Sequence, residues 1–512
     1  MNSKVFRYYA LITFLITMLG SITFSQMQRE EDIISIIKGH ANWNYPDFAL
    51  EKIKSNKIVM LADEGHGTGL YMQTVIEVLY HWVNMYEANY SKGDVQGIPQ
   101  KLFLVLENDS AVDKQLRKYF ISGDLIDVVH PAGFWNYQFS NATLEFLTDL
   151  RSLRLHIDSL NKSNFKSSPL QFDIFCPEKT IDDSNWTVEK RDKYFAFERD
   201  EYSSAKVIKL LEDQQDAHAF IFYGGGHFLL GQQPKPPEKP VGKGYYLAHY
   251  LRKQFQKQGG VYLCDQISIP QTQWLDNAFK KIDRSFAIDD SCWQDVPISI
   301  HKSFPHYDGA IFHTSAPDPS WHMSRFLSET MIDLILQDID RNKNIRNEFQ
   351  RGNLHGWFPY LSTFTDKDYY MPITVDDSLT VEIAIKEIKQ WRQSTKIDVV
   401  ADISNLSIWK RLVERIRNNP DPKSTWYQML LADYIGFIVW YQNGASPQVR
   451  ADAAWKYIER YKKYITIDNL ISVLWIGTAE EKEKALVALK QESGQNFETP
   501  KEWAHWFLQA KL

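Results

Sequence analysis

The chain has 512 residues, of which 44% are hydrophobic and 24% are charged. This composition is that of a globular protein and excludes a disordered or fibrous chain. The formal net charge of −6, with no long basic run, argues against a nucleic-acid-binding protein. A chain of this length is expected to fold into about two or three domains with room to bury their cores.

The first residues have the pattern of a secretory signal peptide. Lys4 and Arg7 precede an apolar run over residues 9–19, and the small residue Ser25 follows. The run is short for a membrane-spanning helix, and no cysteine marks a lipoprotein cleavage site. We therefore predict a signal peptide over residues 1–25. The mature protein is expected to be exported, periplasmic or extracellular, and without a membrane span.

Strand and helix patterns alternate over residues 26–318. Apolar runs predict strands over residues 58–62, 102–106, 170–176, 219–223, 261–264 and 309–313. Helical patterns lie over residues 27–56, 72–79, 143–160, 191–211 and 245–257. Polar, glycine-bearing loops are expected over residues 89–100 and 232–244, the second being long enough to cover a cleft. Strands that alternate with helices predict an α/β domain with a mainly parallel sheet flanked by helices.

From residue 319 to residue 512 the pattern becomes helical. Helices are predicted over residues 380–391, 407–416, 427–441 and 447–464, and a helix pair within residues 468–512. The run over residues 488–497 resembles the end of a HEAT-type repeat array, but no clean period extends through the rest. We predict an all-helical C-terminal domain over residues 319–512. The surface of this domain could bind a protein partner.

Three cysteines, Cys176, Cys264 and Cys292, lack the spacing of a metal site. An exported protein can form a disulfide, and Cys264 with Cys292 is one pairing that the sequence allows. The odd count leaves at least one thiol unpaired, which we expect to be a buried small apolar side chain.

A carboxylate–histidine cluster ends the first predicted strand. Asp63 and Glu64 follow the apolar run, and His66 lies on the glycine-rich turn after them. The carboxyl ends of strands are where open α/β sheets bind ligands. A carboxylate beside an imidazole orients the ring and raises its basicity, which suits a general base. The structural alternative is a turn in which Asp63 caps the next helix.

Ionisable residues also follow two other predicted strands. Glu107 follows the second strand, and His227 follows the fourth after glycines that include Gly225 and Gly226. Glycine amides at such a turn can hold an anion or oxyanion. Arg199, in the helix before the fourth strand, can bind a carboxylate of the site or of a substrate. The structural alternatives are a helix cap for Glu107, a plain glycine turn before His227 and a solvated side chain for Arg199. Taken together, the residues predict that His66 and His227 face one cleft.

The order of these motifs resembles the erythromycin esterase-like family, which is related to the Tiki and ChaN-type haem-uptake proteins. The resemblance covers roughly residues 55–315, and its first turn has Asp63 where the family has glutamate. The other matching segments are the strand Leu104–Glu107, the aromatic Phe134–Trp135, the helix Phe197–Lys206 with Arg199 and Asp200 in register, and the strand end Phe222–His227.

The resemblance implies a hydrolase in which His66 activates water against an ester or lactone of a small-molecule substrate. It implies Asp63, Glu64 and Glu107 as carboxylate partners of the base and His227 as a further polar group of the catalytic cleft. Arg199, Trp135, Gly225 and Gly226 are implied as substrate contacts. No cofactor and no metal are expected in this mechanism.

Two departures from the family keep other functions open. Gly224 stands where the family has the first histidine of a pair, and Gly225 replaces an asparagine. The spacing of Glu64 and His66, and the Gly-x-x-His form of Gly224 to His227, look more like the Tiki and ChaN branch. That branch implies a metal- or haem-binding protein or a metallopeptidase. A third alternative is a non-catalytic binding protein with a degenerate cleft.

Overall fold

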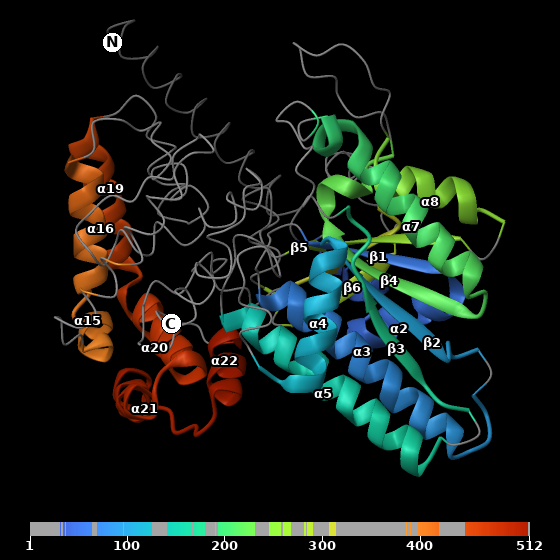
Figure 1. Ribbon diagram of the computed structural model, residues 1–512, viewed down its shortest axis with the longest axis horizontal. Helices are drawn as coiled ribbons and strands as arrows, with labels where there is room; N and C mark the ends of the chain where they lie inside the picture. Colours follow the sequence, from blue (N-terminus) through green and yellow to red (C-terminus); the bar gives the residue numbers. More distant parts are fainter. Residues whose placement is uncertain are drawn as a thin grey trace, which may run out of the picture.

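The computed structural model describes residues 37–63, 69–124, 141–179, 193–230, 245–267, 281–289, 307–313, 398–418 and 446–509, apart from a few positions inside these ranges, and a few isolated residues besides. One part of the molecule is an α/β unit around a seven-stranded sheet with the strand order β3-β2-β4-β1-β5-β7-β6 (Figure 1). All neighbouring strands are parallel except β6 and β7, which are antiparallel. The predicted fold class is confirmed.

The strands of the sheet are β1 (Ile58–Asp63), β2 (Lys101–Leu106), β3 (Gln171–Phe175), β4 (Ala217–Gly224), β5 (Val261–Ile267), β6 (Phe286–Asp289) and β7 (Gly309–Phe312). The helices of the same unit are α2 (Tyr45–Ser55), α3 (Gly69–Tyr90), α4 (Ser110–Ser122), α5 (Asn141–Ser163), the π-helical turn η2 (Tyr194–Glu198), α7 (Arg199–Asp213), the 3₁₀ turn η3 (Gly225–Phe228) and α8 (Leu247–Phe255).

Helices cover both faces of the sheet. In β1, Val59 and Leu61 point into the core formed with α2, α3, α4 and α5, whereas Met60 and Ala62 point into the core formed with α7 and α8. Figure 1 shows α7 and α8 above the strands and α3 and α5 below them. Because successive side chains of a strand alternate between its faces, a strand buried on both sides is apolar throughout. This explains why β1 is buried at every position.

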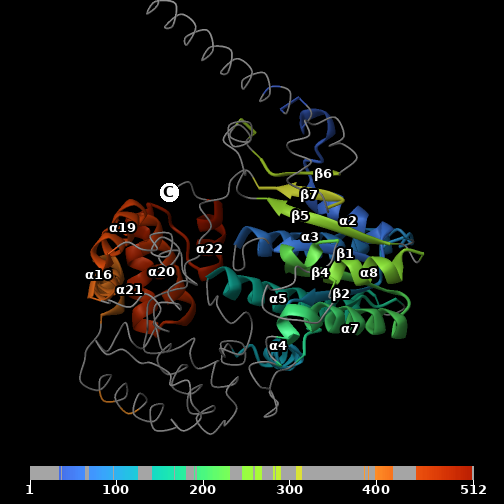
Figure 2. The ribbon, with the colours of Figure 1, turned by 90° about the horizontal axis from the view of Figure 1, so that it is seen from above.

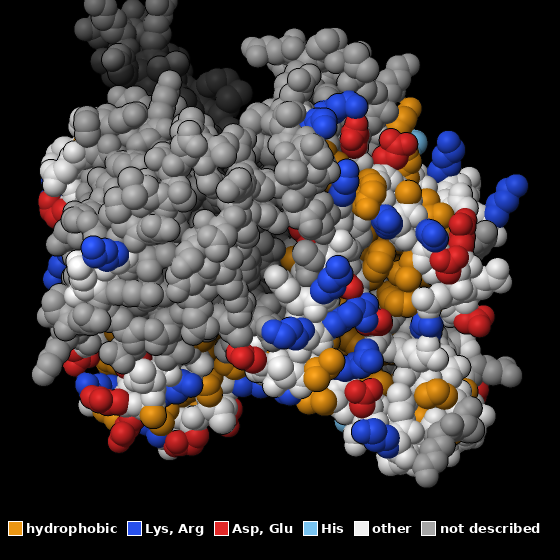
Figure 3. All heavy atoms as spheres, viewed as in Figure 1, with side chains coloured by type: hydrophobic (Ala, Val, Ile, Leu, Met, Phe, Trp, Pro, Cys, Tyr) orange, Lys and Arg blue, Asp and Glu red, His pale blue; other side chains and the backbone are white. Residues whose placement is uncertain are grey.

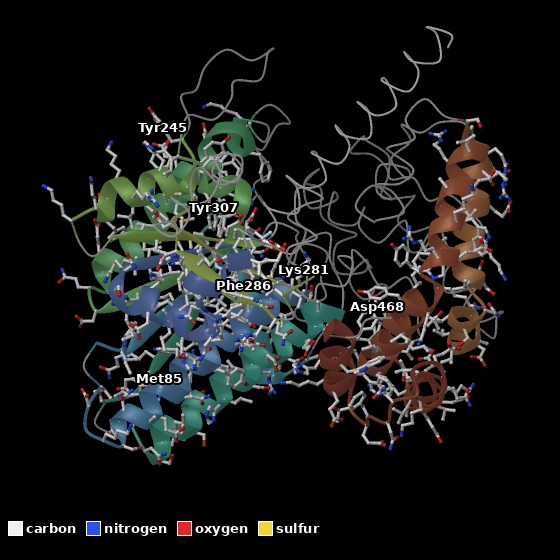
Figure 4. All side chains as sticks on the ribbon, turned by 180° about the vertical axis from the view of Figure 1, so that it is seen from behind. Met85, Tyr245, Lys281, Phe286, Tyr307 and Asp468 are labelled. Carbon is white, nitrogen blue, oxygen red and sulfur yellow. The ribbon has the colours of Figure 1, made fainter. Side chains whose placement is uncertain are left out.

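Strand β6 is the one element of the sheet without a predicted counterpart. It has only four residues and runs antiparallel beside β7. Phe286 of β6, labelled in Figure 4, stacks on Phe312 of β7 with ring centroids 4.9 Å apart. The four-residue run is too short for its periodicity to predict a strand, so β6 is identified only from its pairing with β7.

The connections after β1 and β4 leave on opposite faces of the sheet. β1 is followed by α3, which packs on one face, and β4 is followed by η3 and α8, which pack on the other. The two strands are hydrogen-bonded neighbours, and Asp63 pairs with Gly224 at their carboxyl ends. Adjacent strands whose connections diverge in this way open a crevice at their carboxyl ends, which is where α/β folds bind ligands.

The described C-terminal residues are helical, as predicted. They form α15 (Val399–Ser404), α16 (Ser407–Asn418), α19 (Pro447–Arg460), α20 (Lys462–Ile476), α21 (Ala479–Ser493) and α22 (Pro500–Gln509). Helix α20 is the centre of this group: it contacts α15, α21 and α22, and even its Asp468 (labelled in Figure 4) is buried. Thr478 and Glu481 form a capping box at the start of α21, which satisfies backbone N–H groups there.

The C-terminal helices lie against one helix of the α/β unit. Helices α20 and α22 both contact α5, and Lys501 of α22 forms an ion pair with Asp149 of α5. Figures 1 and 2 show α22 beside the beginning of α5. Glu145, one helical turn before Asp149, is buried in the same region. The division of the chain into domains at residues 25 and 318 stays a prediction.

Several other expectations concern residues beyond the described ranges. The signal peptide over residues 1–25, the loop over residues 232–244 and Cys292 all lie there, whereas Cys176 and Cys264 are free and buried. Within the described part of the chain, no helix is both long and apolar enough to cross a membrane. In Figure 3, Lys and Arg side chains of the described residues are interspersed with Asp and Glu rather than gathered in one patch.

Candidate functional site

Three strand ends meet at one point of the sheet edge. Glu107 follows β2 directly, and its Oε2 accepts a hydrogen bond of 2.6 Å from the backbone N–H of Gly224 at the end of β4. Asp63, at the end of β1, lies beside Gly224 on the other side of β4. The carboxylates of Glu107 and Asp63 are both largely buried. The predicted convergence of these strand ends is therefore present for Asp63, Glu107 and the turn that carries His227.

Arg199 lies between two glutamates. Its Nη2 donates to Oε1 of Glu107 at 2.6 Å, and its Nε donates to Oε1 of Glu178 at 2.9 Å. A further hydrogen bond of 2.5 Å joins Nη2 to the same oxygen of Glu178. The arginine side chain is 20% exposed, whereas the glutamate side chains are 8% and 10% exposed. Charge-assisted hydrogen bonds of this kind are the strong ones and fix the guanidinium plane.

Glu178 reaches this position because the chain beyond β3 continues alongside the chain beyond β2. Its backbone N–H donates to the carbonyl of Asn108 at 3.0 Å, and a parallel β-bridge joins it to Asp109. The hydroxyl of Tyr194 accepts a hydrogen bond of 2.9 Å from the N–H of the next residue, Lys179. The segment that holds Glu178 is thus attached both to β2 and to the turn before Arg199.

The turn before Arg199 is π-helical. Residues Tyr194–Glu198 form one π turn, and α7 begins at Arg199 without a break in the helical backbone. The ring of Phe195 lies 5.7 Å from Cζ of Arg199, within the range of a cation–π contact. Single π turns inside helices are frequent at functional sites, because the extra residue rotates the following side chains.

His227 is held at both ring nitrogens. Its Nδ1 lies 2.6 Å from Oδ1 of Asp200, and its Nε2 lies 3.3 Å from Oε1 of Glu107 and 3.4 Å from Nη1 of Arg199. The ring of Tyr223 meets the imidazole edge-to-face with centroids 5.5 Å apart. The other oxygen of Asp200 accepts a hydrogen bond of 3.2 Å from the N–H of Leu247, the first residue of α8.

The surroundings raise the pKa values of His227, Glu178 and Tyr223, although the individual causes oppose one another. Burial lowers the pKa of His227, but the carboxylates of Glu107 and Asp200 outweigh it and raise that pKa to about 10. Burial raises the pKa of Glu178, and the adjacent Arg199 opposes this shift. Burial likewise raises the pKa of the Tyr223 hydroxyl. At neutral pH the site therefore holds two cations, Arg199 and His227, beside a set of buried carboxyl groups.

The structure brings together five residues that the sequence analysis named: Asp63, Glu107, Arg199, Gly225 and His227. Gly226, in the same 3₁₀ turn, is exposed, and a Cβ there would meet no atom within 4 Å. The glycine amide that binds a carboxylate is that of Gly224, and its acceptor is Glu107.

Three of the named residues lie outside the described residues. In the chain, Glu64 and His66 stand between β1 and α3, and Trp135 precedes α5. β1 ends at Asp63, α3 begins at Gly69, and β1 contacts η3. The strand end that precedes His66 in the chain is therefore next to the 3₁₀ turn that carries His227.

Two site residues were not recognised as such from the sequence. Glu178 follows the third strand as Glu107 follows the second, so the rule that strand ends carry the site residues would have found it. Asp200 stands next to Arg199, and its role depends on a hydrogen bond to a residue 27 positions away. Among the described residues, no group of three or more His, Cys, Asp or Glu side chains is placed to hold a metal ion.

Comparisons with known proteins add little to this geometry. No family model matches the chain, and no curated protein matches it. A solved structure of a succinoglycan biosynthesis protein is similar at 10% sequence identity and a TM-score of 0.34, over 56% of this chain and 97% of the other. A Bacillus cereus protein of known structure is similar at 11% identity and a TM-score of 0.31, with the same coverage. At these values the similarity carries no conclusion about function, so the site itself is the basis for one.

Proposed function

We propose that this protein is an exported hydrolase of the erythromycin esterase-like type, which cleaves an ester or lactone of a small molecule with water activated by His66. One observation carries the proposal: Glu107 at the end of β2 bonds to Gly224, Arg199 and His227, at the carboxyl edge of the sheet and next to the strand end that leads to His66. Such a convergence of charged groups at the switch point of a parallel sheet supports a catalytic site.

The protonation of His227 supports the choice of His66 as the base. A histidine with a pKa of about 10 stays protonated at neutral pH and cannot accept a proton from water. In the proposed reaction, His66 takes the proton of the attacking water while the hydroxyl oxygen bonds to the carbonyl carbon. The ester C–O bond then breaks, and His66 returns the proton to the leaving alkoxide. Asp63 or Glu64 orients the imidazole.

The test uses the chain without residues 1–25 and a panel of p-nitrophenyl esters and lactones. Turnover by the wild-type protein and a loss of about 100-fold or more in kcat for His66→Ala is the expected result. His156→Ala is the matched control, because His156 is exposed on α5 and outside the site. Undiminished turnover by a folded His66→Ala protein would refute the role of His66.

Two further measurements test the rest of the proposal. Elemental analysis and haem titration of the same preparation address the metal- or haem-binding alternative: stoichiometric metal that turnover requires would replace the present mechanism with a metal-dependent one. N-terminal sequencing of protein recovered from the periplasm or medium tests export, for which cleavage after residue 25 is the expected result.

A further inference from the structure

The hydrogen-bond donors of Arg199 are not all used by the two glutamates. A guanidinium group has five N–H donors. Nε and Nη2 carry three of these, and they bond to Oε1 of Glu178 and Oε1 of Glu107. The remaining two are on Nη1, whose neighbour among the described residues is Nε2 of His227 at 3.4 Å. Whether Nη1 has an acceptor therefore depends on the state of that imidazole.

The contacts of His227 determine which of its nitrogens carry hydrogens. Nδ1 faces Oδ1 of Asp200 at 2.6 Å, and an ionised carboxylate only accepts, so Nδ1 is the donor. Asp200 is itself 3% exposed and held by the N–H of Leu247. Nε2 faces another carboxylate oxygen, Oε1 of Glu107, at 3.3 Å. Both nitrogens therefore act as donors, which is the hydrogen-bonding pattern of an imidazolium.

Two donor groups thus face each other, and the acceptor beside Nε2 is Oε1 of Glu107. Nη1 of Arg199 cannot donate to a protonated Nε2, and Oε1 of Glu107 is 2.6 Å from Nη2 but 3.3 Å from Nε2. The two side chains are 20% and 17% exposed, so neither is fully closed off from solvent. One additional oxygen beside both nitrogens would accept from Nη1, to which the described residues offer no acceptor once Nε2 is protonated. It would also give Nε2 a second acceptor besides Glu107.

We propose that Nη1 of Arg199 and Nε2 of His227 form the binding site for the carbonyl oxygen of the substrate and stabilise it as it becomes an oxyanion. This assignment rests on the proposed function and deepens it, because it names the substrate atom that the Arg199 and His227 side chains contact. Glu107, Glu178 and Asp200 position the two donors, and their negative charge disfavours tight binding of a permanent anion. The site therefore favours an oxygen that is neutral in the substrate and gains charge during the reaction.

The first experiment does not require turnover. Methylphosphonate, a tetrahedral oxyanion, is titrated into the ¹⁵N-labelled full mature chain while the side-chain signals of Arg199 and His227 are followed by NMR. Saturable shifts of both side chains, with a dissociation constant in the millimolar range, are expected. Arg199→Lys should weaken binding about 10-fold or more, because an ammonium cannot reproduce the guanidinium geometry. Arg117→Lys is the control, since Arg117 pairs with Asp113 and Asp173 away from the site.

The second experiment separates this proposal from the proposed function. With any ester that the wild type cleaves, Arg199→Lys should lower kcat about 100-fold and change KM less than about 3-fold. Ester turnover combined with a kcat that is unchanged in folded Arg199→Lys would overturn the oxyanion site and leave the hydrolase intact. Absence of turnover with every ester, together with saturable methylphosphonate shifts at both residues, would instead refute the hydrolase and support the oxygen site. Absence of shifts at both residues would also overturn the oxygen site.

Discussion

Asp200 and His227 are joined by a hydrogen bond of 2.6 Å between Oδ1 and Nδ1, and this bond links the first turn of α7 to the turn after β4. Asp200 is almost fully buried, so its charge acts on the imidazole with little screening by water. Together with Glu107 it keeps His227 protonated. The roles proposed for His66 and His227 depend on this pair, because a protonated His227 can donate hydrogen bonds but cannot serve as the base.

Asp200→Asn should lower the pKa of His227 from about 10 towards its ordinary value of 6.5, since one of the two carboxylates that raise the pKa is lost while the opposing burial remains. NMR titration of the His227 ring measures this directly. Asp213→Asn, at the exposed end of the same helix, should leave the pKa of His227 unchanged. An unshifted His227 pKa in Asp200→Asn would show that Asp200 does not control the protonation of the ring.

The stability that His227 contributes should depend on pH. Its pKa is raised in the folded protein to about 10 from 6.5, so folding takes up a proton between these values. The contribution is fully present below about pH 6.5 and is lost as the pH rises to about 10. The difference in free energy of unfolding between wild type and His227→Gln should therefore shrink over this range. Urea denaturation at several pH values measures it; a difference that is constant with pH would contradict the prediction.

Glu145 should produce a second pH dependence, at the contact between α5 and α22. Burial, and after it the neighbouring Asp149, raise the pKa of Glu145 from 4.5 to about 8, and Lys501 opposes them. Folding binds a proton here too, so the contribution of Glu145 to stability falls as the pH rises from about 4.5 to about 8. Above pH 8 the ionised carboxylate is a buried charge beside Asp149.

Glu145→Gln should therefore stabilise the protein at pH 8.5 by about 1–3 kcal/mol, because it replaces a buried charge by a neutral group of similar shape. At pH 4.5 the variant and the wild type should differ by about 0.5 kcal/mol or less. Thermal and urea denaturation at both pH values provide the measurement, with the exposed Glu492→Gln as control. Equal stabilisation at both pH values would point to packing rather than to ionisation.

Glu107→Gln should cost more stability than Glu178→Gln. Both oxygens of Glu107 accept hydrogen bonds, from Gly224 on one side and from Arg199 and His227 on the other. A glutamine there must turn its NH₂ group towards a donor in either orientation. In Glu178 the hydrogen bonds from Arg199 go to Oε1, so a glutamine can keep its carbonyl oxygen in that position.

We expect losses of about 3–5 kcal/mol for Glu107→Gln and about 1–3 kcal/mol for Glu178→Gln, measured by urea denaturation at pH 7. The comparison is internally controlled, because both variants remove one negative charge beside the same arginine. A larger loss for Glu178→Gln would mean that charge, rather than hydrogen-bond geometry, dominates in this cluster.

The architecture of the α/β unit followed from local patterns. Apolar runs such as residues 102–106 and 219–223 predicted strands because a parallel strand between two helical layers must be apolar at every position. Periodic segments such as residues 143–160 predicted helices for a similar reason. Glu107, Arg199 and His227 were identified as site residues because each is charged or polar next to such a buried run or in the helix before it.

Only the tertiary structure decided which of these residues touch. The strand order places β4 between β1 and β2, so that Gly224 lies beside Asp63 while Glu107 bonds to Gly224. No local pattern specifies such an order, because it depends on packing between segments more than 100 positions apart in the chain, such as Glu107 and Gly224.

The same limit applies to Glu178 and Asp200. Their contacts with Arg199 and His227 form only when β3, α7 and β4 have taken their places around β2. The amino-acid sequence by itself determined the strands other than β6, the helices and the ionisable groups at their ends, since these follow from local patterns of apolar residues. The tertiary structure decided the partners of those groups, and with them the protonation of His227, because charge–charge interactions depend on distances that only the folded chain sets.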